Sequence, residues 1–404
     1  MKKYLGIFTL LISVSSVLQW CSLPIKNTFI WWAINTVILF GYYKIWDKKL
    51  FNIQILNIFM LLVLSSAIYG LLYQAEIYWD YKLLYSNLMV FMLPLASYAY
   101  MKPSLLTVTL KTYIKYSPFL LLFLAPFLAS DAFGRLLVPY SFLSLFFILL
   151  NRKYKLMVLA AFVITLYYGY ESRSDVLKFG LCIVLGICFY FERVSLFLSK
   201  FLKFGRYLFL LTPFVFFTLA FTGVFNIFDI DEELGYEGKY SMGVDKNGND
   251  ISALADTRTF LYIEEIQSAV TNNYVIQGNS IARGYYSPSF GFAIDKLRGT
   301  NRGERDSNEV SILNIFNYFG LVGCTVYFFI FIFATYFAIY KSRNRYIPII
   351  GLYVAFRWTF AWIEDFSVFD LNYMFLWIMI GLCFSPLYRN MTDEDFKLWV
   401  KSIN

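Results

Sequence analysis

A dense run of charged residues lies at 298–309, directly before a long apolar stretch. If residues 302–309 are helical, Arg302, Arg305 and Glu309 fall near one face, because they are spaced at i, i+3 and i+7. A carboxylate beside arginines can accept a proton from an attacking hydroxyl while the arginines stabilise an anionic leaving group. The alternative is that Glu309 only neutralises the arginines on a solvated surface.

Five further arginines are candidates for binding an anionic group, because the planar guanidinium suits bidentate phosphate recognition. They are Arg135, Arg173, Arg258, Arg283 and Arg357.

Each of the main candidates has a structural alternative. Arg173 can pair at the membrane interface with Asp175 or Glu171. Arg258 can form a salt bridge with Glu265 on the same helical face, and Arg283, between glycines, can belong to a simple turn. Arg357 falls inside an apolar segment, where an arginine is costly unless it is functional or paired, and Glu364 is the expected partner.

The composition points to a membrane protein. Hydrophobic residues make up 59% of the 404 residues and charged residues only 15%, and the mean hydropathy is +0.57. The chain contains no histidine, which excludes histidine bases, nucleophile relays and metal ligands. All five cysteines fall in or against apolar runs, so we predict no disulfide and no metal site. Nucleotide-binding motifs are absent too, and we expect no cofactor.

The apolar runs predict an all-α polytopic membrane protein with about twelve transmembrane helices. We place the spans near 4–22, 28–46, 53–73, 82–100, 113–130, 136–150, 156–170, 175–191, 207–226, 311–340, 346–363 and 371–388.

The distribution of basic residues predicts the orientation. Alternate connections carry Lys and Arg, while the opposite set is acidic or poor in basic residues. Both termini are therefore expected on the cytoplasmic side, with the polar loop 227–310 outside the membrane. The net charge of +8 is then a topology signal, and it gives no reason to expect nucleic acid as a partner.

Four regions follow: spans one to nine in 1–226, the extracytoplasmic loop 227–310, spans ten to twelve in 311–388, and a solvated cytoplasmic tail at 389–404. Within the loop, glycine-rich 229–250 predicts irregular or hairpin structure. The apolar spacing over 256–272 predicts an amphipathic helix that lies along the membrane surface or caps the core. Residues 278–300, rich in Gly, Ser, Pro and Tyr, predict an extended binding loop.

Several motifs resemble those of the O-antigen ligases and O-antigen polymerases. The segment Glu309-Val-Ser-Ile-Leu-Asn-Ile-Phe-Asn-Tyr-Phe-Gly320-Leu-Val-Gly323 is similar to the family signature that leads into a membrane helix. Glu171-Ser-Arg173 resembles the family's Ser-Arg motif, and the stretch from Arg258 to Gly278 its arginine-to-glycine stretch. The resemblance covers roughly 160–325 by motif and the rest by span pattern alone.

The resemblance implies a glycosyltransferase of the bacterial inner membrane that polymerises undecaprenyl-diphosphate-linked oligosaccharides, with membrane lipids and a chain-length regulator as partners. Glu309 stands where the ligases have histidine, which implies a polymerase and not a ligase. Arg173 and Arg258 would then hold diphosphate with help from Arg283, and Glu309 would act as the base beside Arg302 and Arg305. The ligase activity, and a flippase or transporter for lipid-linked sugars, are the alternatives.

Overall fold

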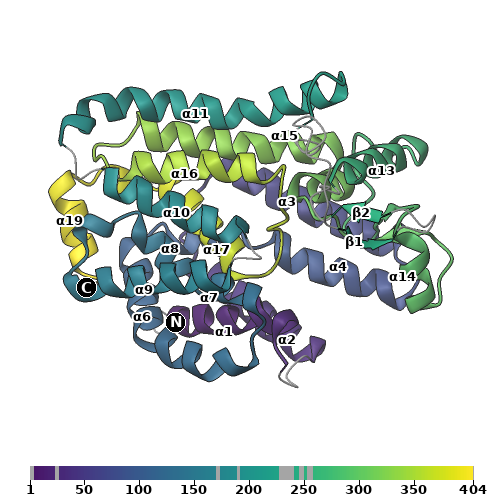
Figure 1. The fold of residues 1–404 in the computed structure, drawn as a ribbon, viewed down its shortest axis with the longest axis horizontal. Helices are drawn as coiled ribbons and strands as arrows, with labels where there is room; N and C mark the ends of the chain where they lie inside the picture. The colour runs from purple at the N-terminus through teal and green to yellow at the C-terminus, as the bar shows by residue number, and fades with distance from the viewer. Residues whose placement is uncertain are drawn as a thin grey trace.

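The computed structural model describes residues 4–22, 27–169, 173–188, 192–226, 241–244, 250–252 and 258–403. Within these ranges the side chains of 19, 131, 173, 192–199, 241–244 and 250–252 are not described. Helices dominate, and the helices and short strands of the polar loop gather at one end of the molecule, at the right of Figure 1. The predicted all-α class is confirmed.

The first half of the chain is helical with short breaks. Its helices are α1 (Tyr4–Val17), α2 (Thr28–Ile45), α3 (Gln54–Tyr69), α4 (Tyr78–Phe91), α5 (Leu95–Tyr100), α6 (Pro103–Leu124), α7 (Phe133–Leu136), α8 (Val138–Ser144), α9 (Arg152–Tyr168) and α10 (Arg173–Cys188). Helix α3 continues as a π-helical turn over Gly70–Gln74. Residues 136–150, predicted as one span, are instead broken into α7, α8 and a 3-10 turn, with Pro139 at the start of α8.

The second half combines long helices with the polar loop. Its elements are α11 (Glu192–Phe221), β1 (Ser241–Val244), β2 (Asp250–Ser252), α13 (Arg258–Thr271), β3 (Tyr285–Tyr286), α14 (Gly291–Arg298), β4 (Glu304–Arg305), α15 (Ser311–Tyr340), α16 (Ile347–Phe360), α17 (Leu371–Phe384), α18 (Pro386–Arg389) and α19 (Asp393–Lys401). The predicted loop helix is present as α13. Residues 278–300 are not wholly extended, since α14 lies among them, and α11 begins before residue 207, where the span was predicted to start.

Within the described residues, four helical segments are long and apolar enough to cross a membrane: Gln54–Gln74, Tyr78–Tyr100, Lys200–Phe221 and Ser311–Tyr340. Three shorter apolar helices, α1, α16 and α17, have 14 residues each. The number of membrane crossings predicted from the sequence is therefore not confirmed.

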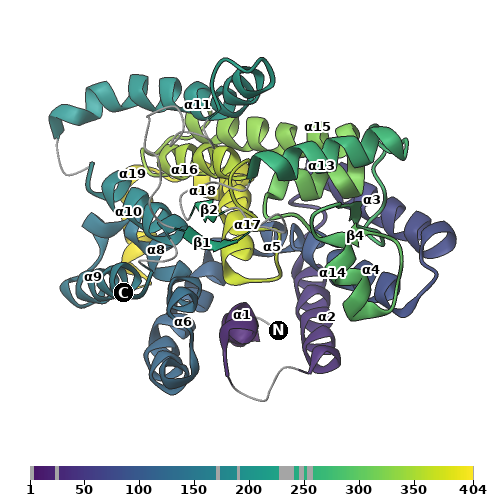
Figure 2. The ribbon, with the colours of Figure 1, turned by 45° about the vertical axis from the view of Figure 1, so that its right-hand side comes forward.

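Helix α17 forms the centre of the bundle, and all of its side chains are buried. It packs against α5, α15 and α16, as Figure 2 shows, with α17 in yellow at the middle of the molecule. Trp377 lies within 6.2 Å of the Tyr327 ring, measured between ring centroids, and Ser97 of α5 donates a 2.6 Å hydrogen bond to the Trp377 carbonyl oxygen. Because α17 is apolar on every side, its side chains need either lipid or other helices around them, and here other helices surround it.

Residues 389–404 were predicted to form a solvated tail, and this prediction is wrong. Thr392 caps α19 by accepting a hydrogen bond from the Asp395 backbone N–H. The helix buries Phe396, Trp399 and Val400, and Phe396 stacks on Tyr346 with ring centroids 4.8 Å apart. The three apolar positions share one face of a short, highly charged helix, and the sequence analysis overlooked that spacing.

Substitution of Phe396 with Ala should lower the free energy of unfolding by about 3 kcal/mol or more, because a fully buried ring leaves a cavity. The matched control is Leu398→Ala on the exposed face of α19, for which we expect a change within about 0.5 kcal/mol. Thermal unfolding of the purified protein in detergent measures both. Equal effects would contradict the packing of α19.

Two glycines bring the polar loop into backbone contact with α15. Gly320 has φ 62° and ψ −161°, a conformation open almost only to glycine. A Cβ at Gly320 would lie 2.3 Å from the Ile276 carbonyl oxygen, and one at Gly278 would lie 2.4 Å from the Phe319 nitrogen. The loop backbone therefore crosses α15 at a distance that excludes any side chain.

Gly320→Ala should destabilise the protein much more than Gly299→Ala. Both glycines have positive φ, but a Cβ at Gly299 would meet no atom within 4 Å, so that variant carries only the backbone strain of about 1 kcal/mol. The difference between the two melting temperatures measures what the close approach and the glycine-only conformation of Gly320 add to the ordinary left-handed strain of Gly299. Similar melting temperatures would show that the crossing tolerates a side chain.

Candidate functional site

Residues 302–309 are not helical, contrary to the sequence prediction. Residues 304–305 form β4, which pairs antiparallel with β3, and helix α15 begins only at Ser311. Arg302, Arg305 and Glu309 therefore do not share a helical face. Arg305 is positioned by the two-residue strand pair, which opposes Tyr285 to Arg305 and Tyr286 to Glu304, and Arg302 and Glu309 lie before and after β4.

Two arginines of the polar loop, Arg302 and Arg283, bind residues of the α3–α4 connection, the first turn of α4 and the strand pair. Arg302 donates to both oxygens of Asp80 at 2.9 Å and to Glu76 Oε2 at 2.6 Å. Arg283 donates to both oxygens of Glu304 through Nε and Nη2, and its Nη1 donates to the Gln74 carbonyl oxygen. Glu304 raises the pKa of the Arg283 guanidinium, which therefore stays protonated.

Arg305 and Arg298 are paired in the same way. Arg305 donates to Glu309 Oε1 at 2.7 Å and lies 4.3 Å from the centroid of the Phe290 ring. Arg298 binds Asp306 bidentately and lies over the Trp79 ring. The structure thus gathers four arginines of the loop and five carboxylates, two of them on Arg302, into a cluster that we call the loop cluster (Arg283, Arg298, Arg302, Arg305 and their partners).

The remaining predicted loop arginine, Arg258, starts α13 and is half-buried. Arg173 starts α10, but its side chain lies outside the described part of the structure. The Asp175 carboxylate, considered with Glu171 as a partner of Arg173, pairs with Lys178.

A second polar cluster lies inside the helical bundle. Lys178 of α10 is buried and donates to Asp175 at 2.7 Å and to both oxygens of Glu364 at 3.0 and 3.1 Å. Ser174 donates to Glu364 as well, at 2.9 Å. The Lys178 ammonium group therefore lies between two carboxylates, and the triad of Lys178, Asp175 and Glu364 carries an excess negative charge.

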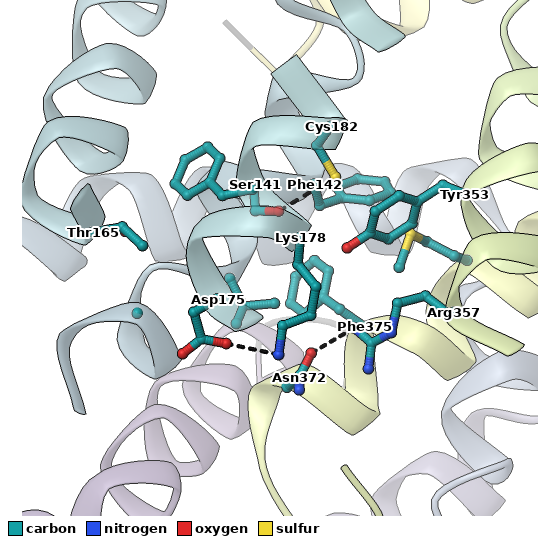
Figure 3. A pocket seen from close by; sticks show the side chains of 14 residues that line it. Ser141, Phe142, Thr165, Asp175, Lys178, Cys182, Tyr353, Arg357, Asn372 and Phe375 are labelled. Atoms are coloured by element: carbon teal, nitrogen blue, oxygen red, sulfur yellow. Dashed lines mark hydrogen bonds and ion pairs between the residues drawn. The ribbon is translucent and has the colours of Figure 1, made fainter. Parts of the chain in front are cut away.

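Arg357 of α16 lies across a small cavity from this triad (Figure 3). Its expected partner Glu364 is taken by Lys178, so the predicted Arg357–Glu364 pair is absent. Instead Nη1 donates to Asn372 Oδ1 at 2.6 Å, and the guanidinium lies 4.4 Å from the Phe366 ring centroid. Arg357 is only 2% exposed, and no atom of the described residues accepts a hydrogen bond from its Nε or Nη2.

Arg135 of α7 lies at the edge of the same region. Its Nη1 is 3.6 Å from Asp370 Oδ2, and its guanidinium lies 3.9 Å from the centroid of the Trp20 ring. The Asp370 carboxylate also caps α17, because its Oδ1 accepts a hydrogen bond from the Tyr373 backbone N–H at 2.8 Å. We call Lys178, Arg357, Arg135 and their partners the interior cluster.

A chain of hydrogen bonds connects the interior cluster to the start of α15. The Ser311 N–H donates to the Glu364 carbonyl oxygen at 3.2 Å, and Ser311 Oγ donates to Asp365 at 3.1 Å. One turn further, Asn314 Nδ2 donates to the Asn308 carbonyl oxygen, and its Oδ1 accepts from the Asn308 N–H. The polar groups at this end of the bundle therefore form one connected region next to Glu309.

Glu265 of α13 is a functional candidate that the sequence analysis considered only as a partner of Arg258. Its neighbour Glu264 accepts hydrogen bonds from Ser287 and Ser289, whereas Glu265 is fully buried and accepts none from the described residues. Burial raises the pKa of Glu265 well above its usual range, opposed by Asn308 and Tyr274. Glu265 therefore keeps its proton beside Asn308, the neighbour of Glu309.

In sequence comparisons, no model of a known protein family matches the chain, and no curated protein matches it.

The proton on Glu265 should appear in the pH dependence of stability. An unfolded glutamate ionises near pH 4.5, while the folded one stays neutral, so the folded protein loses stability as pH rises above that value until the raised pKa is passed. Glu265→Gln should flatten the decline of the melting temperature between pH 5 and 8.

The adjacent Glu264→Gln is the control. It weakens the hydrogen bonds from Ser287 and Ser289, so it should lower the melting temperature while keeping the pH slope of the unaltered protein. An unchanged slope in Glu265→Gln would mean that Glu265 is ionised in the folded state.

Proposed function

We propose that this chain is a metal-independent membrane glycosyltransferase that joins lipid-diphosphate-linked oligosaccharide units into a polysaccharide. The single observation that carries the proposal is the position of the polar groups. In an apolar helical protein, the loop cluster, the interior cluster and Glu265 all lie around the N-terminal end of α15. Buried ionisable groups inside a membrane protein are costly and are characteristic of a substrate site.

The paired state of the loop arginines restricts which of them can receive a substrate. Glu309, the partner of Arg305, has a side chain 59% exposed, so this carboxylate can turn into solvent. Nη2 of Arg302 is bound by Glu76, which is 70% exposed, but Nη1 stays bound to both oxygens of the buried Asp80. Glu304 and Asp306 are half-buried and hold Arg283 and Arg298 bidentately. We therefore assign diphosphate binding first to Arg305, with Nη2 of Arg302 as a second donor and with Arg283 and Arg298 keeping the strand pair in place.

In the proposed reaction a sugar hydroxyl of one lipid-linked unit attacks the anomeric carbon of the other. The new C–O bond forms as the bond to the lipid diphosphate breaks, and the diphosphate leaves with the electron pair. Glu309 accepts the hydroxyl proton, and Arg305, released from Glu309, stabilises the charge on the departing diphosphate. Proton transfer to Glu309 and departure of the diphosphate are then coupled, because Arg305 exchanges Glu309 for the diphosphate.

The same proposal includes the topology: about twelve membrane crossings in a bacterial inner membrane, both termini in the cytoplasm, and the loop 227–310 outside. Undecaprenyl diphosphate as the lipid and a chain-length regulator as partner come from the family resemblance. A ligase is less favoured because the chain has no histidine. A transporter for lipid-linked sugars is the second candidate, and Lys178, Arg206 and Arg357, all buried between helices, favour it.

Glu309→Gln and Arg305→Lys should each reduce polymer formation at least about a hundredfold. The first variant removes the proton acceptor, and the second replaces the planar guanidinium, which can donate two hydrogen bonds to one phosphate. The measurement uses the purified protein with lipid-linked repeat units and scores the glycan ladder on a gel. Arg345→Gln, which breaks an exposed ion pair with Asp393 on the opposite side of the bundle, is the control and should keep the full ladder.

Two outcomes would count against the proposal. If the unaltered protein forms no ladder but moves lipid-linked units across vesicle membranes, the chain is a transporter. If the ladder survives Glu309→Gln, the polymerase stands, and Glu309 is not the proton acceptor.

A further inference from the structure

Arg206 of α11 carries a buried positive charge without a carboxylate beside it. Arg206 is only 5% exposed, and its Nε and Nη2 donate to Thr335 Oγ1 at 2.9 Å and to the Ile332 carbonyl oxygen at 3.2 Å. Both acceptors are neutral, and no carboxylate in the described part of the chain forms an ion pair with Arg206. Lys178, in contrast, lies between two carboxylates. A buried charge is costly unless an opposite charge approaches it, so the surroundings of Arg206 favour an anion.

Two more cations lie at the same end of α11 and α15, around two tyrosine rings. Lys203 Nζ lies 5.5 Å from the centroid of the Tyr340 ring, and Cζ of Arg206 lies 5.6 Å from it. Cζ of Arg206 is also 5.1 Å from the Tyr207 ring centroid, and the Tyr340 hydroxyl donates to the Tyr207 hydroxyl at 3.5 Å. Lys341 follows Tyr340 directly and is exposed, as is Lys203. We call the three cations and the two tyrosines the α11–α15 cluster.

The α11–α15 cluster has three positive charges and no negative charge of its own. Among the residues that the structure describes, no carboxylate pairs with any of its three cations. The acidic residues of α19, at the same end of the bundle in Figure 1, are already engaged. Asp393 pairs with Arg345 at 2.9 Å. Glu394 pairs with Lys397 at 2.7 Å, and Asp395 caps the helix. A ligand is therefore the source that we expect for the balancing charge.

The α11–α15 cluster adjoins an apolar helix face that is directed away from the rest of the protein. The segment Lys200–Phe221 is apolar enough to cross a membrane, and only 22% of its most apolar stretch is buried, against 33%, 39% and 67% in the other three. Helix α11 runs along the upper edge of the molecule in Figure 1, with α15 below it. Phe204, Leu208 and Leu211, on the turns around Arg206, are exposed. A ligand at this place meets cations and tyrosines beside an apolar surface, which is the chemistry that recognises a phospholipid.

We propose that the α11–α15 cluster binds the phosphate of an anionic phospholipid, whose acyl chains lie along the exposed apolar face of α11. Lys203 and Lys341 pair with the phosphate, and the Tyr207 hydroxyl, which accepts from Tyr340, donates its own hydrogen to a phosphate oxygen. Arg206, close to both rings, adds its charge at low dielectric. The lipid is anionic because a zwitterionic headgroup brings a cation of its own. The site requires only that the protein lies in a membrane, and it does not depend on the proposed function.

The test measures the melting temperature of the purified full-length protein in the neutral detergent dodecyl maltoside, with added phosphatidylglycerol, phosphatidylcholine or inorganic phosphate. We expect phosphatidylglycerol at about ten times its dissociation constant to raise the melting temperature by about 2 °C, because it binds the folded state. Phosphatidylcholine has no net charge and inorganic phosphate has no acyl chains, so neither should give a comparable shift.

Two variants at the site check where the lipid binds. Arg206→Gln removes the unbalanced buried charge, so it should melt no lower than the unaltered protein in detergent alone and should gain nothing from phosphatidylglycerol. Lys203→Gln lies on the exposed side and should fold normally, and its affinity for phosphatidylglycerol should fall about fivefold. Arg345→Gln is the matched control, because it also removes one cation at this end of the bundle, but one that is paired with Asp393. Its response should equal that of the unaltered protein.

The outcomes decide the proposal in either direction. A shift that phosphatidylglycerol alone produces, that Arg206→Gln abolishes and that Arg345→Gln keeps supports it. An equal shift with phosphatidylcholine or inorganic phosphate overturns it, and so does a phosphatidylglycerol response that both Arg206→Gln and Lys203→Gln retain in full. None of these measurements involves polymer formation, so the lipid site and the proposed function can fail independently.

Discussion

The pairing of buried charges is the constraint on which the arrangement of this protein depends. Lys178 cannot enter the bundle unless it meets Asp175 and Glu364, and these come from α10 and from the segment after α16. That segment is then anchored to α15, since the Ser311 N–H donates to the Glu364 carbonyl oxygen. One ammonium group thus fixes the positions of α10, α15 and α16 relative to one another, and removing it would leave two carboxylates buried without a positive partner.

The backbone contact between Gly278 and Gly320 fixes the polar loop to this arrangement in a different way. Apolar packing alone would let the loop slide along α15, but a crossing without side chains allows only one position. Asn317 strengthens the same contact, because its carbonyl oxygen accepts from the Asn279 N–H at 2.6 Å and its side chain donates to the Arg283 carbonyl oxygen. The loop cluster is therefore held by α15.

The sequence predicted the helical class, most helix positions and α13, because apolar runs and amphipathic spacing are local properties. It did not predict the broken segment at 136–150 or the packing of α19, where tertiary contacts decide. It identified Arg283, Arg302 and Arg305 but neither Arg298 nor Lys178, and of the carboxylate partners it placed only Glu309 beside its arginine. The other partners are distant in sequence, since Arg302 meets Asp80 and Lys178 meets Glu364 across more than 180 residues. Glu265 was considered only as a partner of Arg258, because both it and Glu264 are buried and only tertiary hydrogen bonds to Glu264 set the two apart.

The charge of the loop cluster has a consequence for how a ligand would arrive. Its four arginines are matched by five carboxylates, and acidic residues outnumber basic ones in the whole loop 227–310, so the loop exerts no long-range attraction on anions in solution. Recognition must then occur at contact, after lateral diffusion within the bilayer has brought the ligand alongside. The rate of encounter should be governed by the abundance and mobility of that ligand in the membrane, without electrostatic steering from solution.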